Sequence, residues 1–206
     1  IGLYASLIVV FAGIGFGVMC ALNQNKFIDR FFMVLSTLGA TIPSFVLATG
    51  FLFIFSKTLG WVPAFGVDTA AGDIGPIVVI GAFSLSFITR LTRTSLLEVQ
   101  QQDYIRTARS KGISEFKVTY KHALRNALLP VITYVGPMVA SIVTGSFVIE
   151  KVFGIPGVGS LFTNSIINRD YPLIMGITVF FAILLIISVL IVDFIYVLVD
   201  PRIKLD

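Results

Sequence analysis

Charged residues are scarce in this chain. Only 13% of its 206 residues are Asp, Glu, Lys or Arg, whereas 56% are hydrophobic. A soluble domain carries about 25% charged residues. Because so few charges cannot cover a surface in water, the composition predicts a protein that lies largely in membrane lipid. We expect lipid as a partner and no nucleic acid.

Groups that perform chemistry are also few. Cys20 is the only cysteine, so no disulfide forms within the chain. His122 is the only histidine, and no cluster of metal ligands surrounds it in the sequence. No P-loop signature is present. We therefore expect no catalytic residue, metal or bound cofactor in this chain, and if ATP drives the protein, another chain must hydrolyse it.

Long apolar runs make up most of the sequence. Residues 1–22 contain no charge, and a helix of 22 residues extends about 33 Å, enough to cross the hydrocarbon core. Four more runs follow, separated by charged or turn-rich stretches. The sequence predicts an all-α polytopic membrane protein with five transmembrane helices, at about 1–22, 31–56, 76–97, 129–149 and 171–199.

Basic residues are divided unequally between the two sides of these predicted spans. Twelve of the 15 fall on the side of residues 98–128 and of the C-terminus, and three fall on the other side. The positive-inside rule places the side richer in Lys and Arg in the cytoplasm. We therefore expect residues 98–128, here called the basic loop, to be cytoplasmic together with the C-terminus.

The basic loop contains two helical patterns separated by Gly112. Glycine can adopt a positive φ and end the first helix there. The second pattern has an apolar stripe of Ile113, Phe116, Tyr120, Leu124 and Ala127, and a basic stripe of Lys117, Lys121 and Arg125. The pattern predicts a helix, a bend and a helix beneath the membrane. It fits either a docking surface for another protein or a loop that lies among lipid headgroups.

The loop also has a recognisable motif. Residues 104–112 read Tyr-Ile-Arg-Thr-Ala-Arg-Ser-Lys-Gly, and Ala-Leu-Leu-Pro follows at 127–130. These stretches resemble the "EAA" coupling loop of ABC importer permeases, with Arg106 in place of the motif's Glu and Ala127 in place of its Ile. Both departures are similar to the dipeptide/oligopeptide permease branch, whose form residues 104–112 match fully.

Three further stretches are similar to the same branch. They are Ile42–Phe45, Phe153–Gly159 leading to Arg169–Pro172, and Asp193–Tyr196 leading to Asp200–Arg202. The resemblance is to the B-type subunit of the peptide permeases and covers almost the whole chain. Members of that family carry one more helix and an outer loop before the position of Ile1, so we expect the family's first helix to be absent here.

The resemblance implies one half of a type I ABC importer in the cytoplasmic membrane of a bacterium or archaeon. A homologous C-type permease subunit would complete the path, two ATPase subunits would bind ATP and Mg, and an extracellular or periplasmic binding protein would deliver the peptide. The basic loop would couple to an ATPase subunit. The implied coupling residues are Tyr104, Ile105, Arg106, Thr107, Ala108, Arg109, Lys111, Gly112, Glu115, Phe116, Lys117 and Tyr120.

Two other functions stay open. Permeases of the nickel branch look nearly the same, so nickel or another small solute is a neighbouring alternative. A transporter or channel that works without an ATPase is a different class. Such a protein would need carboxylates or histidines within the membrane for ion coupling, and the middle of every predicted span lacks ionisable residues. This lack disfavours the second alternative.

Several residues within the spans allow two interpretations. Arg90 and Arg93 either reach cytoplasmic headgroups or form inner-gate ion pairs, for example with Asp193. Four hydroxyl side chains either line a polar path or bond back to their own helices. They are Ser84, Ser86, Thr144 and Ser146.

Two other features concern packing and the outer surface. Gly13 and Gly17 form a G-x-x-x-G pair, which predicts close helix packing. The stretch from Glu150 to Asp170 is expected to be an outer loop that either contacts the binding protein or covers helix ends.

Overall fold

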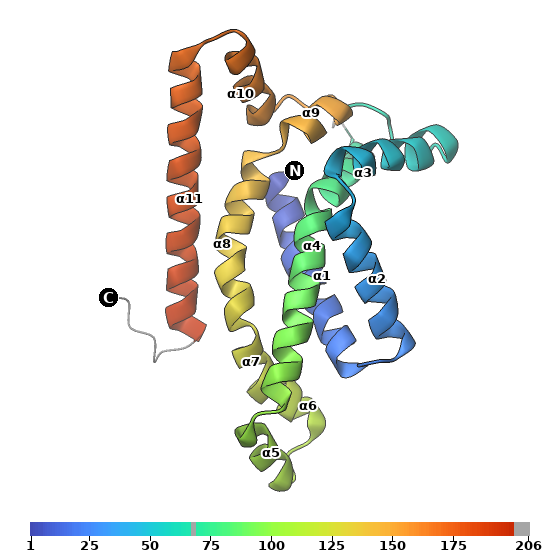
Figure 1. Ribbon diagram of the computed structural model, residues 1–206, viewed down its shortest axis with the longest axis vertical. Coiled ribbons are helices and arrows are strands. Elements are labelled where there is room, and N and C mark those ends of the chain that lie inside the picture. The colour runs from blue at the N-terminus through green and yellow to red at the C-terminus, as the bar shows by residue number, and fades with distance from the viewer. Residues whose placement is uncertain (67–68, 200–206) are drawn as a thin grey trace.

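The computed structural model describes residues 1–66 and 69–199, without the side chains of residues 70, 144, 192–193 and 195–199. Every regular element in these ranges is helical (Figure 1). The first half contains α1 (Gly2–Leu22), α2 (Phe27–Thr41), α3 (Ser44–Phe51), the π-helical η1 (Leu52–Thr58) and α4 (Ala70–Gln100). The second half contains α5 (Asp103–Ser110), α6 (Glu115–Lys117), the π-helical η2 (Val118–Ala123), α7 (Leu124–Ala127), α8 (Leu129–Thr144), α9 (Phe147–Phe153), α10 (Val158–Ile167) and α11 (Tyr171–Val199).

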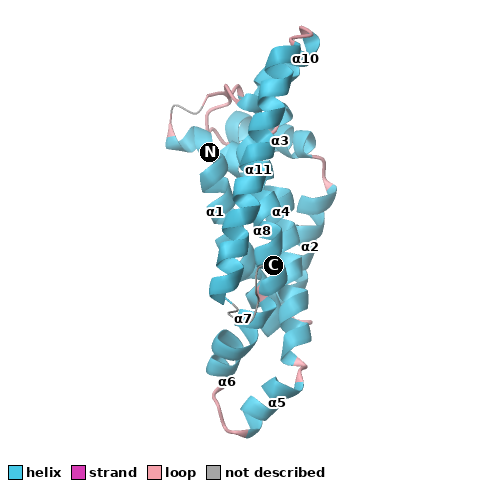
Figure 2. Ribbon diagram, turned by 90° about the vertical axis from the view of Figure 1, so that its left-hand side faces the viewer, coloured by secondary structure: helices cyan, strands magenta, loops and turns pink. Residues whose placement is uncertain are grey.

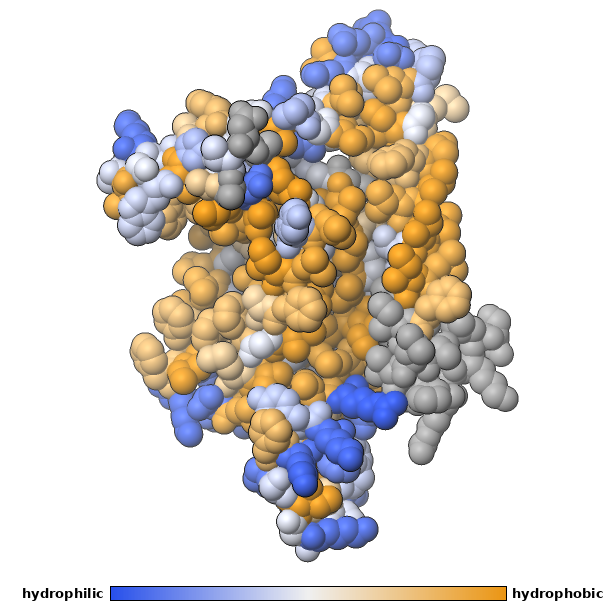
Figure 3. All heavy atoms as spheres, turned by 180° about the vertical axis from the view of Figure 1, so that it is seen from behind, coloured by the Kyte–Doolittle hydropathy of each residue, from blue (hydrophilic) through white to orange (hydrophobic). Residues whose placement is uncertain are grey.

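The long helices carry enough apolar residues to cross a membrane. Three of them, α1, α4 and α11, are long and apolar enough alone, and two bent helix pairs raise the count in the described residues to as many as five. Figure 3 shows apolar side chains in a broad band, with polar residues gathered at both ends of the molecule. The upper count agrees with the five predicted spans.

The predicted helix 31–56, which contains Pro43, is not continuous. It is divided into α2 and the α3–η1 pair, which meet at an angle of 110°. Pro43 lacks an N–H group, and the residue before a proline is driven toward extended backbone. Ile42 accordingly has φ −74° and ψ 125°. The chain therefore turns sideways here, as Figure 1 shows for α3.

Two other predicted boundaries also differ. The third span begins at Ala70 and not at Pro76, because Thr69 caps the helix by accepting a hydrogen bond from the N–H of Gly72. The fourth span ends at Thr144 and not at 149, because Gly145 has φ 82° and ψ 175°, a conformation that interrupts a helix. Residues 150–170, predicted to be a loop, include the end of α9 and all of α10, with non-helical residues at 154–157 and 168–170.

Helices α1 and α4 form the centre of the fold and are very closely packed. A Cβ at Gly13 would lie 2.7 Å from a methyl group of Ile88, and one at Gly17 would lie 2.5 Å from Cβ of Thr92. The predicted packing role of this glycine pair is confirmed. A buried cluster then joins α8 to the pair, and consists of Ala5, Val9, Ile88, Val131, Met138 and Ile142.

Helix α11 is far less enclosed. It contacts α8 and α10. Only 6% of the most apolar 18-residue stretch of α11 is buried, whereas 44% of the corresponding stretch is buried in α1 and in α4. Its exposed side chains are apolar along most of its length. Such a surface requires contact with lipid or with an apolar surface of another protein.

Candidate functional site: the basic loop and a polar pocket

The basic loop folds as a bent pair of short helices beyond the ends of the long ones (Figure 2). Gly112 has φ 75°, and its N–H donates to the carbonyl of Arg109 at 2.9 Å. The predicted hinge at Gly112 is confirmed. After the hinge, α6, η2 and α7 follow one another up to α8.

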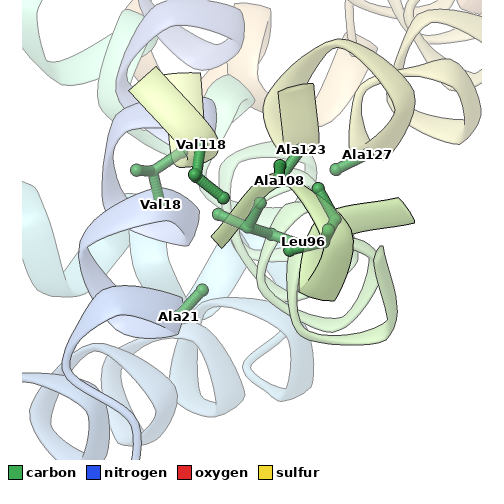
Figure 4. Close-up of a cluster of buried hydrophobic side chains, with 8 residues drawn as sticks. Val18, Ala21, Leu96, Ala108, Val118, Ala123 and Ala127 are labelled. Carbon is green, nitrogen blue, oxygen red and sulfur yellow. The ribbon is translucent and has the colours of Figure 1, made fainter. Parts of the chain in front are cut away.

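A buried cluster, here called the loop anchor, fixes the basic loop to the long helices. Figure 4 shows most of its side chains converging from α1, α4 and the loop. The loop anchor consists of Val18, Ala21, Leu96, Ile105, Ala108, Val118, Ala123 and Ala127. Because five of these residues belong to the loop, the loop is packed against the membrane-spanning helices.

The predicted coupling residues divide into two groups. Ile105 and Ala108 are buried in the loop anchor, where their side chains pack the loop against the long helices. The others are exposed. These are Tyr104, Arg106, Thr107, Arg109, Lys111, Gly112, Glu115, Phe116, Lys117 and Tyr120.

The predicted apolar stripe is wrong in part. Ile113 and Leu124 pack against the loop anchor, but Phe116 and Tyr120 are exposed, with Phe116 71% exposed. The reason is the π-helical turn η2, which adds a residue to the local repeat and shifts the side chains out of α-helical register. The two aromatic rings instead lie against each other, with centroids 4.5 Å apart and ring planes inclined by 34°.

Charged and polar contacts hold the two arms of the loop together. The Nε of Arg109 donates to Oε1 of Glu115 at 2.9 Å across the hinge. The side-chain amide of Asn126 donates to the hydroxyl of Tyr104 at 2.7 Å. A groove of about 490 Å³ lies between this loop and the end of α1. Its lining includes Arg109, Glu115, Phe116 and Tyr120.

An ion pair links the start of α2 to α4 near the basic loop. Arg93 donates from Nε to Oδ1 of Asp29 at 2.6 Å and from Nη2 to Oδ2 at 2.7 Å. The backbone N–H of Asn25 also donates to Asp29 at 2.8 Å. Asp29 is only 2% exposed, so three hydrogen bonds compensate its burial.

The sequence did not identify Asp29 as the partner of Arg93. The proposed partner Asp193 has a side chain outside the described residues, and Arg90 is half-buried with no ion pair among them. The sequence nevertheless held a signal. Asp29 lies just before the predicted second span and Arg93 lies near the end of the third, so both are predicted on the same side of the membrane.

The four candidate path residues differ in their surroundings. Ser84 and Ser146 line one pocket of about 210 Å³, together with Ser44 and Ser141. Ser86 does not line it. Its hydroxyl donates to the carbonyl of Ala82 at 2.7 Å and lies against Gly39 of α2. The side chain of Thr144 lies outside the described residues.

A buried carboxylate organises the end of the molecule opposite the basic loop. Glu150 of α9 is 7% exposed and accepts hydrogen bonds from the N–H groups of Gly159 at 3.3 Å and Ser160 at 2.6 Å. It thereby occupies the first turn of α10, where helix N–H groups have no partner within the helix. Gly145 and Gly157 leave room for it, since a Cβ on either would collide with the carboxylate.

Comparisons with known proteins agree on a transport permease. The family described as "Binding-protein-dependent transport system inner membrane component" matches residues 13–205. The dipeptide transport system permease protein DppB of Bacillus subtilis is 50% identical over 205 residues, which cover 100% of this chain and 67% of that protein. The oligopeptide transport system permease protein OppB of Haemophilus influenzae is 44% identical, over 99% of this chain and 67% of its own length.

A solved structure supports the same fold. The MetNI methionine ABC transporter, in inward-facing conformations, aligns with a TM-score of 0.71 and 19% identity. The alignment covers 97% of this chain and 93% of that chain. The helices described above therefore have the arrangement of a type I ABC importer transmembrane domain.

Proposed function

Since this chain belongs to the family of binding-protein-dependent transport system inner membrane components, we propose that it imports peptides and is coupled to ATPase subunits through its basic loop. The chain is a permease of an ABC importer, and its relatives are transport subunits rather than enzymes. Partner subunits bind and hydrolyse ATP in this proposal. In this proposal the basic loop faces the cytoplasm, which the positive-inside rule supports. The predicted cytoplasmic C-terminus, residues 200–206, lies outside the described residues.

The observation that carries the coupling proposal is the exposed aromatic pair on a rigid support. The rings of Phe116 and Tyr120 contact each other and project from a loop that the loop anchor fixes to α1 and α4. Exposed aromatic anchors flanked by charge are typical of the residues that dominate protein–protein binding energy. Movement of an ATPase subunit bound to this pair would be transmitted to the long helices, whereas a flexible loop would absorb it.

The peptide substrate is supported by the named relatives. Dipeptide and oligopeptide permeases share 38–50% of residues with this chain over nearly its whole length. A second permease subunit would complete the path, and an external binding protein would deliver the peptide. The exposed apolar surface of α11 is suited to lipid or to that second subunit.

Uptake by the assembled importer tests this function. Vesicles would contain this chain, its second permease subunit and the two ATPase subunits, with the binding protein outside and ATP inside. We expect uptake of labelled trialanine that requires both ATP and the binding protein. Uptake of Ni²⁺ in place of trialanine would reassign the substrate, and uptake driven by an ion gradient without ATP would overturn the ABC mechanism.

A further inference from the structure

The pocket formed by Ser44, Ser84, Ser141 and Ser146, here called the serine pocket, lies where several elements meet. It is bounded by the first residue of α3, the middle of α4, the end of α8 and the start of α9. Its other lining residues are apolar or glycine, and none is ionisable. Its volume of about 210 Å³ is below the usual range of about 300–1,000 Å³ for a complete small-molecule site.

Ser84 lacks the bond to its own helix that several other buried hydroxyl side chains make. Ser6, Ser86 and Thr89 each donate to the carbonyl four residues earlier in their own helix. Ser84 is 8% exposed, lines the serine pocket, and has no hydrogen-bond partner within the described part of the chain. Its hydroxyl is therefore available to bond a molecule that enters the pocket. Thr92 also lacks a side-chain partner within the described residues, but it does not line the serine pocket.

We propose that the serine pocket is a subsite of the membrane path that holds one peptide unit of a passing peptide, with Ser84 bonded to its main-chain amide. This assignment rests on the proposed function. Hydroxyl groups can donate to a carbonyl or accept from an N–H, so they suit an amide of any side-chain sequence. The pocket provides no carboxylate, histidine or thiol, the groups that transition-metal ions require.

Thiol labelling in the complete importer tests the assignment. The natural Cys20 is buried and would be replaced by alanine to leave no background thiol. Ser146→Cys then introduces a thiol in the pocket, at a position whose side chain makes no capping hydrogen bond. We expect labelling of this thiol to be prevented by trialanine in a concentration-dependent manner.

A matched pair of second substitutions tests the role of Ser84. Added to Ser146→Cys, Ser84→Ala should raise the half-protecting trialanine concentration about two- to tenfold, the worth of one hydrogen bond. Ser86 is two residues away but does not line the pocket, so Ser86→Ala should change the half-protecting trialanine concentration less than twofold.

The possible failures are distinguishable. If the wild-type importer takes up trialanine but the pocket thiol is labelled equally with and without it, the pocket is only a hydrated cavity and the subsite is overturned. Equal effects of Ser84→Ala and Ser86→Ala would overturn the role of Ser84. If the wild-type importer takes up no trialanine, the proposed function fails, and the subsite fails with it.

Discussion

Arg93 and Asp29 form a two-point ion pair that joins α4 to the start of α2, with heavy-atom distances of 2.6 and 2.7 Å. Loss of one partner from a buried pair typically costs about 3–5 kcal/mol, because the other charge remains buried without compensation. We therefore expect Asp29→Ala to lower the thermal unfolding midpoint of the purified chain in detergent markedly.

The matched control is the exposed pair of Arg106 and Asp103, whose side chains are 71% and 97% exposed. Exposed pairs contribute about 0–1 kcal/mol. Asp103→Ala should therefore unfold close to the wild-type temperature. If Asp29→Ala and Asp103→Ala unfolded alike, Asp29 would not stabilise the fold.

The crossing of α1 and α4 gives a second prediction. A Cβ at Gly17 would lie 2.5 Å from Cβ of Thr92 and 2.8 Å from the carbonyl oxygen of Thr89, so the helices would have to separate. Overpacking of this kind typically costs about 1–3 kcal/mol. Gly17→Ala should lower the unfolding midpoint, while Gly15→Ala, which meets nothing within 4 Å, should leave it unchanged or raise it. A midpoint for Gly17→Ala equal to that for Gly15→Ala would contradict the close packing.

The hinge of the basic loop gives a third prediction. No atom lies within 4 Å of a Cβ built on Gly112, so only its positive φ of 75° restricts substitution. Asparagine adopts this conformation readily, but a β-branched residue does so only with strain. We expect Gly112→Asn to retain peptide-stimulated ATP hydrolysis in the reconstituted importer and Gly112→Val to reduce it severalfold. Similar activity of the two variants would show that the conformation of the hinge is not required.

Glu150 gives a fourth prediction, at the end of the molecule opposite the basic loop. Glu150→Ala would leave the N–H groups of Gly159 and Ser160 without their acceptor, at a cost of about 1–3 kcal/mol. Hydrogen exchange of the amides at the start of α10 should then accelerate by about tenfold or more. Lys151→Ala, one residue along and exposed, is the control and should exchange as the wild type does. Unchanged exchange in Glu150→Ala would mean that other contacts hold this turn.

The spans and the hinge were predictable from the sequence because they depend on local chemistry. A helix satisfies its own backbone within lipid, so an uncharged run of sufficient length is enough to indicate one. Gly112 likewise indicated a change of backbone direction, because glycine adopts a positive φ readily. Pro43 was also visible, but the sequence alone did not show that the chain would bend by 110° there.

The contacts between distant residues were not predictable in the same way. Asp29 and Arg93 are 64 positions apart, and their pairing depends on how α2 packs on α4. The sequence places Glu150 in a predicted outer loop. Its role as hydrogen-bond acceptor for Gly159 and Ser160 depends on the formation of α10, which the sequence did not predict. The exposure of Phe116 depends on the π-helical turn η2, whose change of register has no clear sequence signature.

Cross-linking from Phe116 in the assembled importer tests most directly whether the basic loop binds an ATPase subunit. In a Cys20→Ala background, Phe116→Cys should cross-link to an ATPase subunit, because this side chain is 71% exposed on the proposed coupling surface. Phe11→Cys is the control, since Phe11 is 73% exposed but lies midway along α1, a helix without charged residues. We expect an ATPase cross-link from position 116 and none from position 11. No cross-link from position 116 in an importer that still takes up peptide would contradict coupling through the basic loop.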